Sequence, residues 1–337
     1  LGAVVAPLVW MVTGGRGMST VGMGPLTVIK RAGRLLLESG SPYLPMDQLT
    51  GPESLNPYGP PLTIFGLPHA LGLDGWAGNP RTWFVLSAAL LGYAALRLMR
   101  AGHPVRTLAA AFASPVLALP VALGSTDLPV LGLLVLGIAL LTRAPRTGDP
   151  GSSAGVPATT ALAGAALGVA CAMKATALPA VLVLLPMRLG RHGWRPALTF
   201  TASGVLAALT SAALTAPAML TDSRDLIHNM VMFPLRLTSQ QTTAASPMPG
   251  QVVATDGSGG KLLMIGLLAA VLAAVCVYLW RRPAPGLATA ALQMTVIWSL
   301  IFTLAPSTRY GYFVYPLLML GFRAVLSDRN QGSPPQS

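Results

Sequence analysis

The sequence predicts an all-α membrane protein, a bundle of about ten transmembrane helices with long external loops. Of the 337 residues, 53% are hydrophobic and only 9% are charged, whereas a soluble domain spends about a quarter of its residues on charge. The mean hydropathy is +0.62, and long apolar runs alternate with short basic clusters. This composition argues against a water-soluble enzyme of this length, and a chain this apolar is not disordered.

The formal net charge of +12 predicts membrane orientation rather than nucleic-acid binding. Most basic residues flank hydrophobic runs, where they set the direction of insertion, and aromatic residues do not interleave with them. Cys171 and Cys276 lie inside apolar runs and are interpreted as buried thiols. No disulfide framework or metal-ligand spacing is present, so no metal and no cofactor are expected.

Ten segments are apolar enough to be read as spans, since a bilayer core needs about 20 helical residues, or about 17 at the short end. They are 1–14, 82–100, 105–123, 127–142, 158–173, 175–187, 197–216, 261–280, 286–304 and 310–326. A single helix over 158–187 would be about 45 Å long, too long for one crossing, so a hairpin turning near Lys174 is expected. Residues 1–326 are assigned to one transmembrane domain and 327–337 to a disordered cytoplasmic tail.

Basic clusters follow every second predicted span. They are Arg97, Arg100 and Arg106; Arg143 and Arg146; Arg188, Arg191 and Arg195; Arg281 and Arg282; and Arg323 and Arg329. All fall on one side of the predicted topology, which the positive-inside rule assigns to the cytoplasm. The sequence therefore predicts a multi-pass plasma-membrane protein with external segments 15–81 and 217–260 and a flexible cytoplasmic linker at 143–157.

The first external segment offers an amphipathic helix and two rigid aromatic clusters. A helix over Leu26–Ser39 either seals the bundle at the interface or attracts a lipid phosphate. Tyr43 and Tyr58 stand in Pro- and Gly-rich stretches that cannot be helix interior. Their rings suit a sugar face, although tyrosine is also common in the aromatic belt of a membrane protein. The apolar run 62–73 is too short to cross and is predicted to be re-entrant or interfacial.

Three charged residues sit at the outer ends of predicted spans, namely Asp127, Lys174 and Arg309. A charge at membrane depth costs roughly 2.5–3.5 kcal/mol on insertion scales, so each needs an explanation. Lys174 either snorkels to the surface or binds an anionic ligand. A Lys and an Arg at one face are what an anionic, lipid-linked substrate would require for its phosphate.

Several stretches resemble the multi-span GT-C glycosyltransferases, and most closely glycosyltransferase family 87. They are Gly124–Val130 (GSTDLPV), Ala163–Ala170 (AGAALGVA), Lys174, Trp194-Arg195, Tyr58–Leu62 (YGPPL) and Arg309–Tyr312 (RYGY). The resemblance extends over residues 35–325. It implies a GT-C-like fold and an inverting transfer of a hexose, mannose above all, from a polyprenyl-phosphate donor to a glycan or glycolipid acceptor at the outer face.

The resemblance also implies roles for individual residues. Lys174 and Arg309 would bind the donor phosphate, and Tyr43, Tyr58 and Tyr310 would contact substrate.

The family keeps a catalytic carboxylate soon after the first span, but no acid lies between Gly14 and Lys30. Asp47 is therefore the predicted base, because it lies in the first external segment between the two Pro/Tyr clusters. Asp127 is its rival, although it would equally well cap the helix that begins at Leu128. Two other classes stay open, a lipid or glycolipid transporter and a non-catalytic homologue. A transporter would show midplane charges or an internal repeat, and neither is evident.

Overall fold

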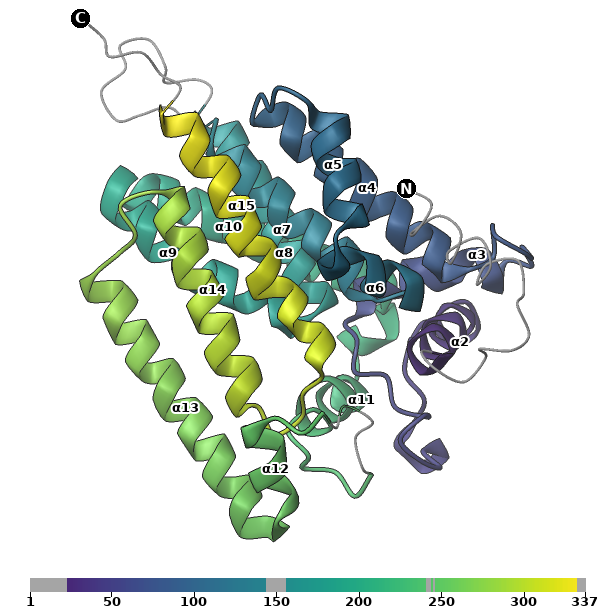
Figure 1. The fold of residues 1–337 in the computed structure, drawn as a ribbon. Coiled ribbons are helices and arrows are strands. Elements are labelled where there is room, and N and C mark those ends of the chain that lie inside the picture. Colours follow the sequence, from purple (N-terminus) through teal and green to yellow (C-terminus); the bar gives the residue numbers. More distant parts are fainter. Residues whose placement is uncertain (1–22, 144–155, 241–243, 245, 332–337) are drawn as a thin grey trace, which may run out of the picture.

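The computed structural model describes residues 23–143, 156–240, 244 and 246–331. The predicted first span at 1–14 and most of the linker 143–157 lie outside these residues. The regular secondary structure of the described residues consists of helices, and Figure 1 shows the long ones arranged as a bundle. This agrees with the predicted helical membrane protein.

The elements follow one another along the chain as α2 Met23–Ser39, η1 Met46–Gln48, η2 Pro60–Gly66, α3 Leu67–Ala70, α4 Pro80–Leu98, α5 Pro104–Ala113, α6 Pro115–Leu123, α7 Asp127–Leu141, α8 Val156–Met173, η3 Ala175–Ala177, α9 Leu178–His192, α10 Trp194–Thr215, η4 Pro217–Leu220, α11 Arg224–Ile227, η5 His228–Met232, α12 Pro249–Thr255, α13 Gly257–Arg281, α14 Leu287–Leu304, η6 Tyr310–Phe313 and α15 Val314–Gln331. Proline opens α4, α5, α6 and α12, where its missing N–H costs nothing.

The number of membrane crossings differs from the prediction of about ten. In the described part of the chain, three helices are long and apolar enough to cross a bilayer, α10, α13 and α14. The count rises to four if α5 and α6 form one broken span, since they meet at 71°. Ser114 precedes a proline and is extended there (ψ 148°), as the proline ring requires. Apolar helices such as α7, with 15 residues, are shorter than one full crossing.

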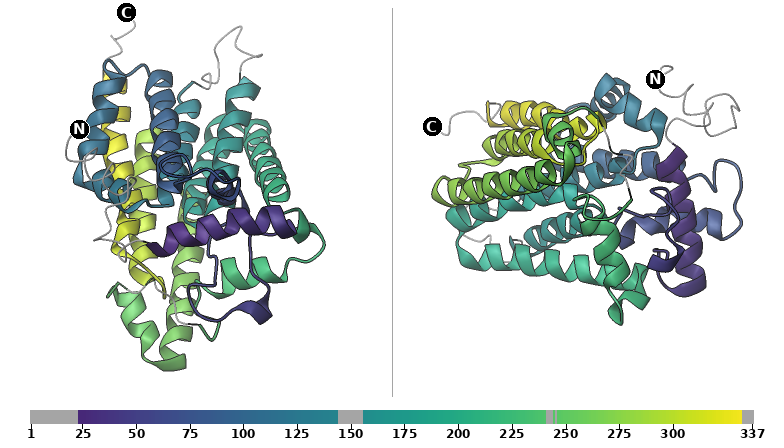
Figure 2. Two further views of the ribbon diagram at one scale, coloured as in Figure 1. Left: turned by 90° about the vertical axis from the view of Figure 1, so that its right-hand side faces the viewer. Right: turned by 90° about the horizontal axis from the view of Figure 1, so that it is seen from below.

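Helix α2 confirms the predicted amphipathic helix and extends it three residues upstream, to Met23. Figure 2 shows it lying across the long helices rather than along them. Its buried face, which includes Ile29 and Ala32, packs against η2 in the predicted interfacial run. The two elements touch backbone to backbone, because a Cβ at Gly66 would lie 2.0 Å from the carbonyl oxygen of Ile29.

The centre of the bundle is built on small residues. Helix α8 packs between α7 and α10, and α7 is buried along most of its length. Gly164 and Gly168 of α8 are spaced four residues apart and face Phe200 and Gly204 of α10. Small residues at this spacing let two helix backbones approach closely, which is how helices associate in a bilayer.

Gly168→Ala is expected to lower stability by about 1–3 kcal/mol, the usual cost of overpacking. A Cβ there would lie 2.0 Å from the carbonyl oxygen of Gly204, a backbone atom that cannot turn away. Gly266→Ala is the matched control, since no atom lies within 4 Å of its new Cβ. Thermal unfolding of the detergent-solubilised variants measures the difference. Equal melting temperatures would show that α8 and α10 are not in this contact.

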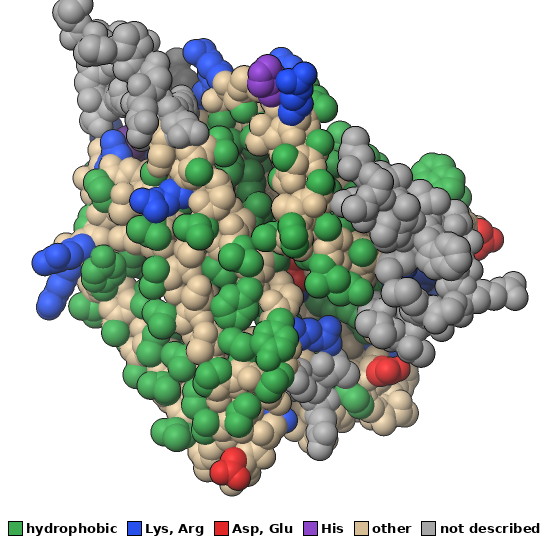
Figure 3. Space-filling view, viewed as in Figure 1, with side chains coloured by type: hydrophobic (Ala, Val, Ile, Leu, Met, Phe, Trp, Pro, Cys, Tyr) green, Lys and Arg blue, Asp and Glu red, His purple; other side chains and the backbone are tan. Residues whose placement is uncertain are grey.

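The outer surface of α13, α14 and α15 is broadly apolar. Figure 3 shows hydrophobic side chains spread over this face, with Lys and Arg gathered mainly towards its upper and left edges. Exposed residues of α13 include Leu262, Leu263, Leu267 and Trp280. Such an extended apolar surface fits contact with lipid. Helix α15 runs on to Gln331, so the first residues of the predicted tail are helical, and the rest lies outside the described residues.

Candidate functional site

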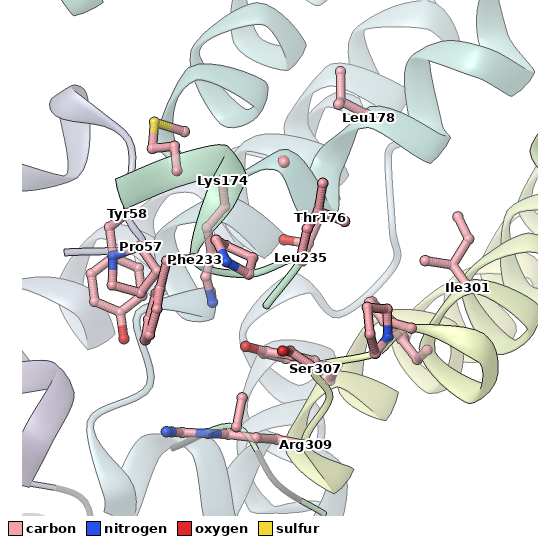
Figure 4. A pocket seen from close by; sticks show the side chains of 18 of the residues that line it. Pro57, Tyr58, Lys174, Thr176, Leu178, Phe233, Leu235, Ile301, Ser307 and Arg309 are labelled. Carbon is pink, nitrogen blue, oxygen red and sulfur yellow. The ribbon is translucent and has the colours of Figure 1, made fainter. Parts of the chain in front are cut away.

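A cavity of 610 Å³ opens among parts of the chain that are far apart in sequence. Its wall is made by the start of α2, the segment 52–58, the break between α8 and α9, the segment 230–235, and the junction of α14 with α15, while α13 closes one side. This volume is typical of a small-molecule or cofactor site. Figure 4 shows Lys174 and Arg309 reaching the cavity from different elements.

The break that carries Lys174 is the predicted turn between 158–173 and 175–187. Helix α8 ends at Met173, Lys174 is extended (φ −155°, ψ 128°), and a 3₁₀ turn leads into α9. Gly59 packs against this break and donates its backbone N–H to the carbonyl of Met173 at 2.8 Å. A Cβ at position 59 would fall 1.6 Å from the carbonyl oxygen of Ala172. Only glycine fits at position 59. This close approach of the chain to the break places Tyr58 beside Lys174.

Lys174 and Asp127 form the one salt bridge among the residues that the structure describes. The Lys174 Nζ lies 2.5 Å from Asp127 Oδ1, and both side chains are less than a tenth exposed. Tyr315 donates its hydroxyl to the same oxygen at 2.7 Å, and Ser125 donates to Asp127 Oδ2 at 2.9 Å. The carboxylate is thus held by three donors, which satisfies a charge that burial would otherwise make costly.

The network continues from Asp127 across the bundle. The hydroxyl of Thr176 donates to the Tyr315 hydroxyl at 2.9 Å. The indole N–H of Trp298 donates to the carbonyl of Thr176 at 2.7 Å. Trp298 and Tyr315 also pack ring against ring, with centroids 5.4 Å apart. The chain of bonds ties α7, the α8–α9 break, α14 and α15 together around Lys174.

Two tyrosine rings flank the Lys174 ammonium. Its Nζ lies 5.5 Å from the ring centre of Tyr58 and 5.2 Å from that of Tyr312, within the range of a cation–π contact. Burial raises the pKa of the Tyr58 phenol, an effect that the neighbouring ammonium of Lys174 opposes. Tyr58 therefore stays neutral at physiological pH.

Arg309 and Tyr312 both line the cavity, whereas Tyr310 does not. The 3₁₀ turn Tyr310–Phe313 follows directly after Arg309. With three residues per turn, positions 309 and 312 share one side. Tyr310 is 58% exposed and was the predicted substrate contact. The three-residue repeat of the 3₁₀ turn would have selected Tyr312 as the cavity residue, and the sequence prediction missed it.

One side of the cavity is lined by aliphatic side chains. Leu178 and Leu182 of α9, Leu268 and Leu272 of α13 and Ile301 of α14 contribute to it. Leu178 is half exposed. The site therefore combines a cationic, aromatic end with an apolar side that belongs to the lipid-facing helices.

Glu53 is the acid that borders the cavity within the described residues. Arg31 of α2 holds its segment, donating to the backbone carbonyls of Glu53 and Ser54 at 2.8 Å each. Asp47 is exposed in η1 and is not part of the cavity wall. It lies near Asp225, whose pKa is raised mainly by burial and Asp222 and to a lesser extent by Asp47.

Tyr43, a predicted substrate contact, is 2% exposed and does not border the cavity. Its hydroxyl donates to the carbonyl of Tyr58 at 2.8 Å. Asn56 supports the same segment, because its backbone N–H donates to the Asn229 side chain at 2.7 Å. Tyr43 therefore holds the loop that presents Tyr58. No group of three or more His, Cys, Asp or Glu side chains that would suit a metal occurs in the described part of the chain.

The fold and this cavity define an integral-membrane protein with a buried cationic site between its helices, next to a lipid-facing wall. A comparison with protein families then supplies the particular family. The model of glycosyltransferase family 87 matches residues 56–306, and the chain belongs to this family of GT-C-type membrane glycosyltransferases. The matched region contains Asp127 and Lys174, and ends just before Arg309. No curated protein and no solved structure matches the chain significantly.

Proposed function

We propose that this glycosyltransferase moves a hexose, with mannose as the first candidate, from a polyprenyl-phosphate donor to a glycan or glycolipid of the cell envelope at the outer face of the plasma membrane. The observation that carries the proposal is the composition of the 610 Å³ cavity, which joins two cations to an aliphatic wall. A lipid-linked sugar phosphate has the matching parts. Its phosphate would lie at Lys174 and Arg309, and the first isoprene units would lie along α9 and α13.

The cations serve the chemistry as well as binding. Transfer of the sugar breaks its bond to the phosphate oxygen, and negative charge develops on the departing polyprenyl phosphate. Positioned cations stabilise such developing charge. The neutral phenol of Tyr58 and the ring of Tyr312 would face the sugar, because tyrosine offers a flat apolar face together with a hydroxyl.

A base is required because a sugar hydroxyl is a poor nucleophile. Three acids compete for this role. Glu53 borders the cavity, Asp47 lies on the same external segment but outside the wall, and Asp127 already accepts three hydrogen bonds. The cavity geometry favours Glu53, so we assign the proton-accepting role to it rather than to Asp47 or Asp127.

The test is transfer of radiolabelled mannose from a polyprenyl-phosphate donor in membranes that contain the protein. Incorporation into a lipid or glycan product is expected with this donor and not with a nucleotide-linked mannose. A Lys174→Gln/Arg309→Gln double variant is the control for endogenous transferases. Binding of the donor without any transfer would favour a transporter or a non-catalytic homologue. Absence of both binding and transfer would overturn the proposal. Assays with other polyprenyl-linked hexoses would then show whether only the choice of mannose is wrong or the whole class of polyprenyl-phosphate donors.

The orientation of the site is tested by cysteine labelling. In a Cys171→Ser/Cys276→Ser background, Thr50→Cys is expected to react with a membrane-impermeant maleimide in intact cells. Arg100→Cys, from one of the basic clusters, is expected to react only after permeabilisation, since basic loops stay in the cytoplasm. The reverse pattern would place the cavity on the cytoplasmic side and would exclude the proposed outer-face reaction.

A further inference from the structure

We propose that Asp127 is a positioning residue, a permanent counter-ion that holds Lys174 at the cavity wall and weakens the affinity of the site for phosphate. The inference rests on the proposed function for the identity of the ligand, a polyprenyl phosphate. In this role Asp127 is not a base. Removing its charge is expected to strengthen phosphate binding, whereas most substitutions in a binding site weaken it.

The contacts of Asp127 leave it poorly suited to take a proton from a substrate. Oδ1 accepts from Lys174 at 2.5 Å and from Tyr315 at 2.7 Å, while Oδ2 accepts from Ser125 at 2.9 Å. The residue is 5% exposed and is absent from the cavity wall. Lys174 stands between Asp127 and the cavity. An acceptor hydroxyl in the cavity would therefore meet the ammonium first.

The same contacts fix the direction of the Lys174 side chain. An unbranched lysine has several rotatable bonds and loses much rotamer entropy when it is held in one place. Here the ion pair with Asp127 and the rings of Tyr58 and Tyr312 hold the ammonium. Lys174 is held in this way where it lines the cavity. Asp127 thus supplies a pre-oriented cation, which lowers the cost of ordering it when the ligand binds.

The pairing has an electrostatic cost for the ligand. A phosphate bound to Lys174 would lie within a few ångströms of the Asp127 carboxylate, and the two like charges repel. The repulsion lowers affinity for the donor and also for the polyprenyl phosphate that remains after transfer. A site that keeps a counter-ion behind its lysine therefore releases its anionic product more readily, at some loss of binding strength.

The test uses a sugar-free polyprenyl phosphate as the probe, with the purified full chain in detergent. Asp127→Asn, which keeps the shape and removes the charge, is expected to bind the probe about tenfold more tightly than the wild type. Turnover of the mannosyl donor is expected to fall because product release slows and the ammonium loses its fixed direction. Tyr315→Phe keeps the charge and removes one hydrogen bond, so its affinity is expected to stay within about twofold while turnover falls modestly.

Other outcomes separate the alternatives. If Asp127 were a base, Asp127→Asn would lose turnover with unchanged probe affinity, and the inference would fail. If the ion pair were only structural, the variant would melt earlier with unchanged affinity, which also contradicts it. Should Asp127→Asn not fold, Asp127→Glu keeps the charge but displaces it, so an affinity for the probe near the wild-type value is expected, and a tenfold gain would contradict the inference. A wild type that binds the probe but transfers no sugar would refute the proposed function while leaving this binding test intact.

Discussion

Glu53→Gln is expected to lower the rate of sugar transfer by about 10²–10⁴-fold, the usual loss on removing a general base, with little change in donor binding. Glu53 lines the cavity, and Arg31 holds its backbone there by donating to its carbonyl oxygen. The amide keeps the size of the side chain but cannot accept the proton from the acceptor hydroxyl. Initial rates with labelled donor, together with an equilibrium measurement of donor binding, separate the two effects.

Three further variants make this result specific. Asp47→Asn removes an acid from the same interhelical segment that lies outside the cavity wall, and its activity is expected to stay within about twofold of the wild type. Glu53→Asp keeps the carboxylate but shortens its reach, so partial activity is expected. Added formate is expected to restore some turnover to Glu53→Ala, because a small free carboxylate can enter the vacated space. Full activity in Glu53→Gln beside a dead Asp47→Asn would return the role to Asp47.

Much of the fold was predictable because its signals are local. Helix α2 follows from its amphipathic pattern, and the break at Lys174 follows from the length of the apolar run 158–187. The number of membrane crossings was not predictable in this way. Whether a short apolar helix such as α7 spans the bilayer or lies within the bundle depends on how its neighbours pack, and hydropathy does not report this.

The site shows the same division between local and long-range information. The charge of Lys174 at the end of a predicted span is the local signal that predicts a functional role, whereas its bond to Asp127 crosses 47 residues of sequence. The Tyr315–Asp127 bond crosses 188. No periodicity within a single helix predicts such contacts, which arise from the assembly of α7, α8 and α15. Likewise, Glu53 and Asp47 are chemically alike on one loop, and only the folded loop shows which of them borders the cavity.

Arg309→Gln is expected to reduce kcat by about 10²–10³-fold, the range found when one donor that stabilises developing charge is removed. Arg309 enters the cavity from the α14–α15 junction, whereas Lys174 enters from the α8–α9 break (Figure 4). Two cations on separate elements would contact different oxygens of one phosphate. Asp127 neutralises part of the Lys174 charge, and under the proposed function Arg309 would add a second positive charge that attracts the leaving group.

The control variants for Arg309 follow from geometry and charge. Arg309→Lys keeps the charge but loses the planar, two-pronged guanidinium that suits phosphate oxygens, so an intermediate rate is expected. Arg224→Gln removes an arginine outside the cavity wall, and its rate is expected to match the wild type. Because the charge on the departing phosphate grows during transfer, Arg309→Gln is expected to lower kcat more than it weakens donor binding. An increase in KM with unchanged kcat would mean that Arg309 only captures the donor, and that stabilisation of the leaving group depends on Lys174.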